Sequence, residues 1–590
     1  MAKEGDYTIE NLYQGGYSSL KPPTQHYVTA GSMGLTTDPR SANILKEVSA
    51  KLASGVKQIE LATVSPEIFE AIPKQHLKEV NRLSKLTGVD ISVHGPVVDT
   101  TGINQQGFSE INREATERKL KMVVERSHEL SPDGNIPVTF HSAEGIPGTE
   151  FEMTPEGRKP KRLVVINRES GKPTAVEAEK KYYPGTIKVR EEMLDPKKQL
   201  KALNDTEWDN SLSQVEFNRE HAERILKDTH PMYRALYLKV LEREVDPGSM
   251  SDKEHEEIKK IHSAGEYLKQ AEMTVRALFS RAYKYGTEEN KKVLDTLSEQ
   301  YGKELGIKEN GKIDISSLDP KRQSNALFVL ANGLQSVNPN IYTPIEDFAI
   351  DQSSKTFGNV AFESYKKFKD KAPIVNIENP PAGFALSTGE ELRKLIEKSR
   401  EQFVTKAVEE GMSKSEAKRQ AEKLIGATWD VGHINMMRKY GWEEKDIIKE
   451  SEKIAPLVKH VHLSDNFGFE HTELPMGMGN VPIQEIMKKL GKKGYEAKKI
   501  IEAGHWWQHF QTSPFKETME AMGSPIYSME MAPYWNQAPG FQQDYFGGFG
   551  MILPQINYET FGAGFSQLPA ELGGQRQGAQ GGRMGGSPME

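Results

Sequence analysis

Short apolar runs alternate with charged, amphipathic segments over most of the chain. Eight of these runs are rich in β-branched residues and end in glycine or polar residues, as expected of strands buried on both faces. They occupy residues 27–34, 56–64, 89–96, 136–145, 373–381, 425–433, 458–466 and 497–504. Helical patterns lie between them, for example at 39–54, 73–87, 112–130, 388–411 and 482–494. Eight repeats of strand and helix predict an α/β fold, the (β/α)8 TIM barrel. A doubly wound sheet is the alternative, although it rarely needs eight consecutive units.

Two segments depart from this alternation and set the predicted domain boundaries. Residues 1–150 hold strands one to four and residues 346–525 hold strands five to eight. Residues 151–345 form a large, mainly helical insertion after the fourth strand, with a hairpin pattern at 162–183. The insertion leaves from the face where barrels carry active sites, so it is either a lid or partner-binding subdomain, or a surface addition without chemistry. Residues 526–590, rich in Gly and Gln, are expected to form a disordered tail, or else a tail that binds a protein partner.

Composition narrows the functional classes. The chain has 590 residues, with 77 basic and 84 acidic side chains and a net charge of −7. That balance gives no bulk signature of nucleic-acid binding, although a local basic groove would not be visible in the sum. The absence of cysteine excludes disulfides, thiolate metal sites and cysteine nucleophiles. No apolar run approaches 18 residues and the N-terminus lacks a signal-peptide core, so we expect a cytoplasmic protein that binds no membrane.

Ligand-type residues follow six consecutive predicted strands, from the third to the eighth. They are His94, His141, Glu378, Asp430 with His433, His462 with His471 and Glu473 in the next loop, and Glu502. In a parallel barrel these strand ends converge on one mouth. Nine imidazoles and carboxylates would repel or desolvate one another there unless a cation neutralised them. Any one of them alone is more often a structural histidine or a helix cap, but the joint pattern predicts a divalent metal site held by nitrogen and oxygen.

Three further histidines are left outside this predicted site. His460 alternates with His462 and is expected to face the opposite side of its strand. His505 and His509 follow the eighth strand, where they could line the rim.

Six short segments together resemble a known superfamily. They are HGPVVDTTG (94–102), VTFHSAEG (138–145), IENPPAGF (377–384), WDVGH (429–433), HLSDN (462–466) and IIEAG (500–504). Their order and positions resemble the xylose-isomerase-like barrels, and within them most closely endonuclease IV, the apurinic/apyrimidinic endonuclease family 2. The resemblance covers about residues 25–150 and 345–510. It implies a multinuclear site with up to three zinc ions, although manganese or iron also suits these ligands.

The resemblance also implies how the ligands are shared among the metals. One metal would be held by His94, His141 and Glu378; a second by Glu378, Asp430, His462 and Glu502; and a third by His433, His471 and Glu473. Glu378 would bridge two metals and position the nucleophilic water. The loop at 471–473 departs from the family pattern Asp-x-His, because here His471 precedes Glu473. The set for the third metal nevertheless keeps two imidazoles and one carboxylate.

This resemblance favours a metal-dependent hydrolase, an endonuclease IV-like phosphodiesterase that acts at abasic sites in DNA. Bound metals can supply a hydroxide near neutral pH and stabilise the leaving alkoxide. His94 and His141 support this interpretation, because one-metal relatives commonly lack them. Against it, residues 63–73 contain no Arg or Lys, whereas a grip on DNA normally depends on basic contacts to phosphate.

Two alternatives remain open at this stage. A single-metal sugar (phosphate) isomerase or epimerase would need only Glu378, Asp430, His462 and Glu502. Glu378 and Glu502 would then be the catalytic pair that moves a proton beside the metal-bound hydroxyl and carbonyl. A non-catalytic scaffold barrel is the third interpretation, and the intact ligand set argues against it.

Overall fold

The computed structural model describes residues 32–522, except for 54–55, 64, 105, 155–156, 185–188, 308–314, 505, 507–509 and 511–512. The predicted tail at 526–590 lies outside the described residues, as do His505 and His509.

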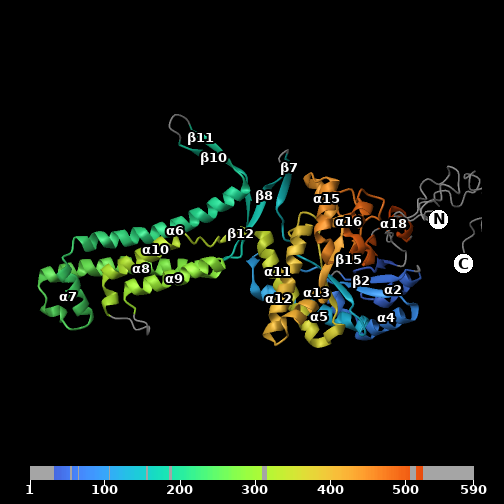
Figure 1. Ribbon diagram of the computed structural model, residues 1–590, viewed down its shortest axis with the longest axis horizontal. Helices are drawn as coiled ribbons and strands as arrows, with labels where there is room; N and C mark the ends of the chain where they lie inside the picture. Colours follow the sequence, from blue (N-terminus) through green and yellow to red (C-terminus); the bar gives the residue numbers. More distant parts are fainter. Residues whose placement is uncertain are drawn as a thin grey trace, which may run out of the picture.

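Eight parallel strands close into a barrel near one end of the molecule (Figure 1). They are β1 (Met33–Thr36), β2 (Gln58–Ala62), β3 (Asp90–His94), β6 (Pro137–His141), β13 (Ile374–Glu378), β14 (Ile425–Asp430), β15 (Val458–Leu463) and β16 (Lys498–Ile501). The order around the barrel is β1-β16-β15-β14-β13-β6-β3-β2, so β1 closes the ring between β16 and β2. Each strand overlaps one of the eight predicted runs, which confirms the TIM barrel.

The first strand extends further than its apolar run, which ends at Gly34. Gly34 pairs with Gln58 of β2 and with Ile500 of β16, and the ladder continues to Thr36. A Cβ atom on Gly34 would lie 2.4 Å from the Gln58 carbonyl oxygen. The glycine therefore lets two backbones approach closely instead of ending the strand.

Helices pack around the outside of the barrel and follow its strands in sequence. The larger ones are α2 (Ile44–Leu52), α4 (Lys74–Thr87), α5 (Glu110–Ser127), α11 (Ile345–Phe368), α12 (Gly389–Glu409), α13 (Lys414–Leu424), α15 (Glu444–Ile454) and α16 (Ile483–Glu496). Shorter elements are α3 (Pro66–Ala71), α14 (Val431–Asn435), α18 (Phe515–Ala521) and the strand pair β4 (Ile103–Asn104) and β5 (Gly107–Phe108).

Helix α12 shows how the sequence sets one of these elements. A capping box of Thr388 and Glu391 satisfies its first backbone amides, since each side chain accepts from the other residue's N–H. Leu395 and Phe403 lie on its buried face, which packs against α11 and the sheet. The predicted helix at 388–411 therefore begins and ends close to the observed bounds.

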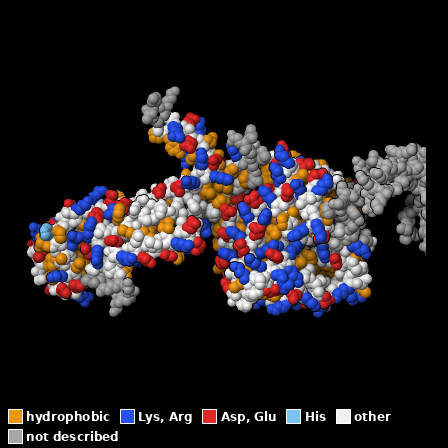
Figure 2. Space-filling model, in the orientation of Figure 1, with side chains coloured by type: hydrophobic (Ala, Val, Ile, Leu, Met, Phe, Trp, Pro, Cys, Tyr) orange, Lys and Arg blue, Asp and Glu red, His pale blue; other side chains and the backbone are white. Residues whose placement is uncertain are grey.

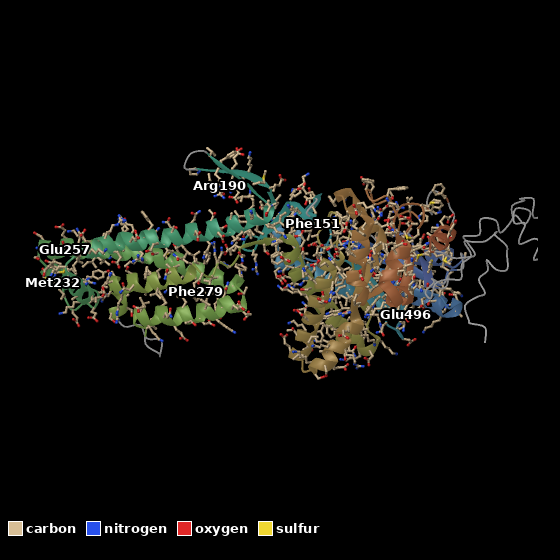
Figure 3. All side chains as sticks on the ribbon, turned by 45° about the horizontal axis from the view of Figure 1, so that its top comes forward. Phe151, Arg190, Met232, Glu257, Phe279 and Glu496 are labelled. Carbon is tan, nitrogen blue, oxygen red and sulfur yellow. The ribbon has the colours of Figure 1, made fainter. Side chains whose placement is uncertain are left out.

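The segment between β6 and α11 forms an arm that projects from the barrel (Figure 1). Its helices are α6 (Pro196–Lys227), α7 (Pro231–Leu241), α8 (Asp252–Tyr285), α9 (Glu288–Leu305) and α10 (Pro320–Leu334). Trp208, Leu268 and Val275 belong to a hydrophobic core that is separate from the barrel core. At 1.5 Å per residue, α6 alone is about 48 Å long. In Figure 3, Met232 and Glu257 mark the far end of the arm, while Glu496 lies on the barrel.

A small sheet joins the arm to the barrel. Its strands are β7 (Glu150–Thr154), β8 (Gly157–Asn167), β9 (Pro173–Glu177) and β12 (Tyr342–Pro344). β8 pairs with β9 within the segment 162–183, for which a hairpin was predicted, whereas residues 179–183 belong to another strand pair. A second pair, β10 (Glu179–Tyr183) with β11 (Arg190–Leu194), stands apart from this sheet. The Arg168 amide donates to the Ile341 carbonyl over 2.9 Å, so the chain enters and leaves the arm at adjacent points.

Charged side chains of both signs are interspersed over the visible faces of the barrel and the arm (Figure 2). Within the described part of the chain, every helix is too short or too polar to cross a lipid bilayer.

Candidate metal centre

The predicted ligands gather at the carboxyl end of the barrel because each lies at, or just after, the end of a strand. His94, His141, Glu378 and Asp430 are the last residues of their strands, His462 is the penultimate residue of β15, and Glu502 follows β16 directly. Strand register places Glu378 beside His141 and Asp430 beside His462. All six side chains are buried or nearly so, with Glu378, Asp430 and His462 at 0% exposure.

Four of these residues form one compact group. Glu378, Asp430, His462 and Glu502 each offer a ligand atom, and these atoms all lie within 4.8 Å of one another. The His462 Nδ1 atom lies 2.7 Å from Glu378 Oε1 and 3.2 Å from Glu502 Oε1. Asp430 is held in place because its carboxylate accepts from the backbone amide of His433 over 2.6 Å. This group has the four nitrogen and oxygen donors that one divalent cation needs.

A second group shares Glu378 with the first. His94, His141 and Glu378 also offer ligand atoms that lie within 4.8 Å of one another. His94 Nε2 and His141 Nε2 lie 3.1 and 3.5 Å from Glu378 Oε2, the carboxylate oxygen that does not face His462. Glu378 therefore turns one oxygen toward each group, which is the arrangement that a bridging ligand requires.

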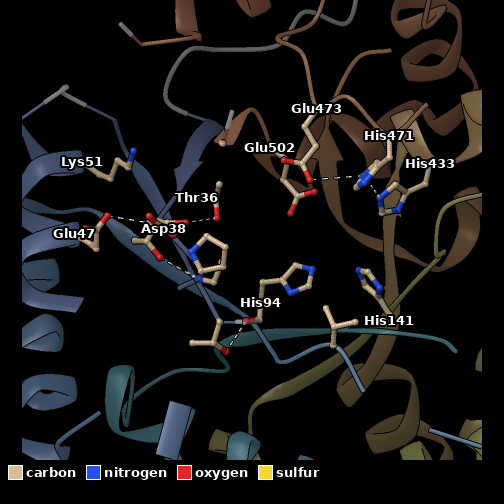
Figure 4. Close-up of a pocket in the computed structure, with 16 residues that line it drawn as sticks. Thr36, Asp38, Glu47, Lys51, His94, His141, His433, His471, Glu473 and Glu502 are labelled. Atoms are coloured by element: carbon tan, nitrogen blue, oxygen red, sulfur yellow. Dashed lines mark hydrogen bonds and ion pairs between the residues drawn. The ribbon is translucent and has the colours of Figure 1, made fainter. Parts of the chain in front are cut away.

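The third predicted set is only partly assembled. His433 Nε2 lies 2.8 Å from His471 Nε2, and His433 Nδ1 is 2.8 Å from the Asn379 carbonyl oxygen. Glu473 is further away, with its Oε1 atom 3.8 Å from His471 Nε2 (Figure 4). Among the described residues, these three are not a group whose ligand atoms all lie within 4.8 Å of one another. The reversed loop thus brings the two imidazoles together and leaves the carboxylate at the edge.

The three carboxylates of the four-residue group have shifted pKa values in the absence of a cation. Burial and the nearby charge of Glu378 raise the pKa of Asp430. Burial likewise raises the pKa of Glu502 well above its ordinary value, with Glu378 adding to the rise and His462 opposing it. The pKa of Glu378 itself is lowered, because His462 and His94 outweigh the effect of burial. Burial thus opposes charge on Asp430 and Glu502, and a divalent ion would favour the ionised form of all three carboxylates.

Glu60 and His460 also belong to this interior, and the sequence analysis missed both. His460 was expected on the opposite side of its strand from His462, and that expectation is wrong. Side chains alternate with a period of two, so residues 460 and 462 share one face. Both contact Glu60, with His460 Nε2 2.9 Å from Glu60 Oε2 and His462 Nε2 3.0 Å from Glu60 Oε1. A glutamate in the middle of the apolar run 56–64 was the available signal.

A cavity of about 400 Å³ opens above the ligands (Figure 4). Its walls include His94, His141, His433, His471, Glu473 and Glu502, together with residues that follow β1 and residues of α2. Asp38, Glu47, Glu473 and Glu502 line it, together with Lys51 and the four histidines. None of the described residues that line it comes from the arm at 150–345. The cavity is thus enclosed mainly by barrel loops and is lined by both carboxylates and basic side chains.

Residues 367–523 match the protein family described as xylose isomerase-like TIM barrel. That segment carries β13 to β16 and every candidate ligand from Glu378 to Glu502. The sequence of the second half of the barrel is therefore similar to that family.

One curated relative is similar over a short stretch. An uncharacterized protein, MJ1311 of Methanocaldococcus jannaschii, is 31% identical over 80 residues, which are 14% of this chain and 26% of that protein. The chain thus spans about a quarter of the length of this curated relative.

Three solved structures are similar to this chain at low sequence identity and low TM-score. A D-tagatose 3-epimerase-like protein is 13% identical with a TM-score of 0.37, covering 85% of this chain and 99% of its own. D-psicose 3-epimerase with D-tagatose from Clostridium cellulolyticum is 8% identical with a TM-score of 0.36, covering 84% and 99%. The 3-keto-D-glucoside 4-epimerase YcjR from E. coli is 10% identical with a TM-score of 0.34, covering 84% and 98%. These values are too low to assign a function.

Proposed function

We propose that this protein is a metal-dependent sugar isomerase or epimerase that works with one divalent cation. The observation that carries the proposal is the group of Glu378, Asp430, His462 and Glu502, whose ligand atoms lie within 4.8 Å of one another beside the cavity. Three carboxylates and one imidazole suit manganese, zinc or iron. The interpretation that was the alternative in the sequence analysis thus becomes the preferred one.

The two glutamates of this group are the candidates for proton transfer. Glu378 ends β13 and Glu502 follows β16, with β14 and β15 between them in the barrel. Glu502 lines the cavity, while Glu378 lies deeper and is held 2.7 Å from His462. When bound, the cation would polarise the carbonyl and hydroxyl of a sugar. One carboxylate can then remove the proton from the hydroxyl-bearing carbon next to the carbonyl, while the other returns a proton.

The cavity supports a neutral sugar as the substrate. Four carboxylates, four histidines and one lysine are among the described residues that line it. Protein–DNA contacts depend on Lys and Arg, and Lys51 is the one such side chain among these residues. A volume of about 400 Å³ is sufficient for a monosaccharide. The size of the cavity and its shortage of Lys and Arg therefore favour an uncharged polyol over the abasic DNA favoured by the sequence.

Exchange of carbon-bound hydrogen tests this proposal directly. The protein would be loaded with Mn²⁺ or Zn²⁺, incubated in D2O with a panel of ketoses, and followed by NMR. We expect deuterium to enter a position next to the carbonyl of at least one ketose, and Glu502→Gln to abolish that exchange. Absence of exchange with every ketose by fully loaded protein would contradict the proposal.

A three-metal phosphodiesterase remains the second candidate, because His94, His141 and Glu378 form their own ligand group. Metal analysis of the purified protein and incubation with an abasic-site duplex separate the two functions. One ion per chain and an intact duplex support the isomerase. Three ions per chain together with nicking of the duplex would establish the phosphodiesterase.

A further inference from the structure

A second layer of inward-facing side chains lies one step below the ligands, and six of its members are polar. Five of these precede a candidate ligand by two positions and Glu60 precedes Ala62 of the cavity wall, so all six point into the same barrel interior. They are Glu60, Ser92, Thr139, Asn376, Thr428 and His460, all at 2% exposure or less. Barrel interiors are usually filled by branched apolar residues, so a polar layer at this depth calls for a reason.

Glu60 connects this lower layer to the metal centre. Its Oε2 atom accepts from Ser92 Oγ over 2.8 Å and lies 2.9 Å from His460 Nε2. Its Oε1 atom lies 3.0 Å from His462 Nε2. Glu60 Oε2 therefore contacts two partners in its own layer, Ser92 and His460. Its other oxygen, Oε1, lies beside the candidate ligand His462.

His462 uses its two ring nitrogens in opposite directions. Nδ1 faces Glu378 and Glu502 in the ligand group, whereas Nε2 faces Glu60. If Nε2 carries the hydrogen, Nδ1 would be the ring nitrogen with a lone pair to bind a cation in the ligand group. A carboxylate behind a ligating imidazole fixes both the tautomer and the orientation of the ring.

We propose that Glu60 and His460 are a positioning pair for His462, Glu60 by fixing the ring and His460 by holding Glu60. The inference rests on the metal centre of the proposed function, but not on the substrate. Neither residue lines the cavity, so both act through His462 and not on the sugar.

A second cation among Glu60, His460 and His462 is the competing interpretation, since their ligand atoms also lie within 4.8 Å of one another. Two features favour direct contacts between the side chains. The separations of 2.9 and 3.0 Å are those of polar atoms in direct contact, and the contact of His460 Nε2 with Glu60 Oε2 is a hydrogen bond. In addition, this group offers three protein ligands with all three side chains at 0% exposure, so water cannot readily supply a fourth.

Metal affinity is the first readout. Mn²⁺ binding to the full chain would be measured by calorimetry for the parent, for Glu60→Gln and for Thr139→Val. Thr139 is the matched control, because it lies in the same layer and its hydroxyl pairs with Thr428 over 2.7 Å. We expect Glu60→Gln to weaken binding by about 10–100-fold, as loss of such a partner does elsewhere, and Thr139→Val to leave it within about twofold.

A double-mutant cycle separates positioning from a general structural effect. In the His462→Gln background, adding Glu60→Gln should cause no further loss of Mn²⁺ affinity, because the two changes act on one ligand. The visible spectrum of bound Co²⁺, which reports its ligands, should change in the same way for Glu60→Gln and His462→Gln. Should Glu60→Gln fail to fold, His460→Gln tests the pair from its other end, with about a tenfold loss expected.

Several results would overturn the inference. Unchanged affinity in Glu60→Gln, or additive losses in the cycle, would show that Glu60 does not act through His462. Two ions per parent chain, one of them lost in His460→Gln, would establish the second cation instead. A parent chain that binds no divalent ion would refute the proposed function together with this inference, whereas equal binding by parent and Glu60→Gln would refute this inference alone.

Discussion

Glu378 belongs to both ligand groups of the candidate metal centre. It is fully buried, and its two oxygens face different ligand groups. Its charge also lowers the cost of keeping His94 and His462 protonated in the metal-free protein. Replacement of this one carboxylate should therefore affect both metal binding and chemistry.

The first prediction concerns Glu378→Gln, which keeps the shape and removes the charge. We expect ketose–solvent hydrogen exchange to fall by about 10²–10⁴-fold, the range typical of a lost acid–base group, and metal affinity to fall as well. Glu473→Gln is the matched control, because Glu473 lies outside the four-residue group. Exchange at the parent rate in Glu378→Gln would contradict the role given to this residue.

The second prediction concerns the pH dependence of the metal-free protein. Burial lowers the pKa of His94, but its hydrogen bond to Glu378 and the charge of Glu378 outweigh that effect and raise it from 6.5 to about 9. The folded protein thus keeps a proton that the unfolded chain releases above pH 6.5. The resulting stability is complete below pH 6.5 and is lost as the pH rises through 9.

Thermal melting in EDTA from pH 6 to 10 measures this effect. The melting temperature should decline between pH 6.5 and 9, and His94→Gln should flatten that part of the curve. Parallel curves for the parent and His94→Gln would show that another group is responsible.

At the residue scale, the sequence predicted which residues lie at the strand ends better than it predicted their side-chain contacts. His94, Glu378, Asp430 and Glu502 could be predicted because each follows an apolar run, and strand ends must converge in a barrel. The contact between Glu60 and His462 could not be predicted, because β2 and β15 are 400 residues apart and meet only when β1 and β16 close the ring. Rotamers also decide which carboxylate oxygen meets which imidazole, as the distant Glu473 shows.

At the scale of elements, periodicity predicted the strands well but left the geometry of the arm open. Runs such as 425–433 are apolar and β-branched, so they form strands wherever they lie. The insertion was predicted to be mainly helical without bounds for its helices, and its first helix, α6, begins where Asp195 caps its first turn. How α6 packs on α8 depends on side chains that are distant in sequence, such as Trp208 and Val275.

The third prediction follows from the separate core of the arm. Leu268 on α8 is 1% exposed inside that core, so Leu268→Ala should destabilise the arm by about 2–5 kcal/mol. Hydrogen exchange should accelerate in α6 and α8 but not in the barrel strands, and Mn²⁺ affinity should stay unchanged. Leu395→Ala on α12 is the matched control, since it should loosen the barrel and weaken the metal site. Faster exchange in β13 or β15 of Leu268→Ala would show that the two cores are coupled.

At the scale of the whole molecule, the candidate site belongs to the barrel, and the arm is a separate structural unit. The described cavity walls come from the barrel and its loops, and the arm adds a second core at a distance from them. The described lining of the cavity therefore does not support the interpretation of the insertion as a lid. The arm is free to serve a different function.

The fourth prediction is that the barrel keeps its metal site without the arm. Arg168 and Ile341 are hydrogen-bonded neighbours, so a short glycine turn can replace residues 169–340. This variant should fold and bind Mn²⁺ within about threefold of the parent, because the change removes no ligand and no residue of the barrel core. Calorimetry and circular dichroism check it, and a folded variant without metal affinity would show that the arm supports the site.

The closeness of Arg168 and Ile341 also has an evolutionary consequence. A segment whose two ends meet in one ladder of hydrogen bonds can be acquired or lost through a single genetic event at one surface turn. The strand ends that carry the ligands need not change when that happens. Barrels of this kind can therefore diverge in the structures they display while the chemistry at the mouth is inherited intact.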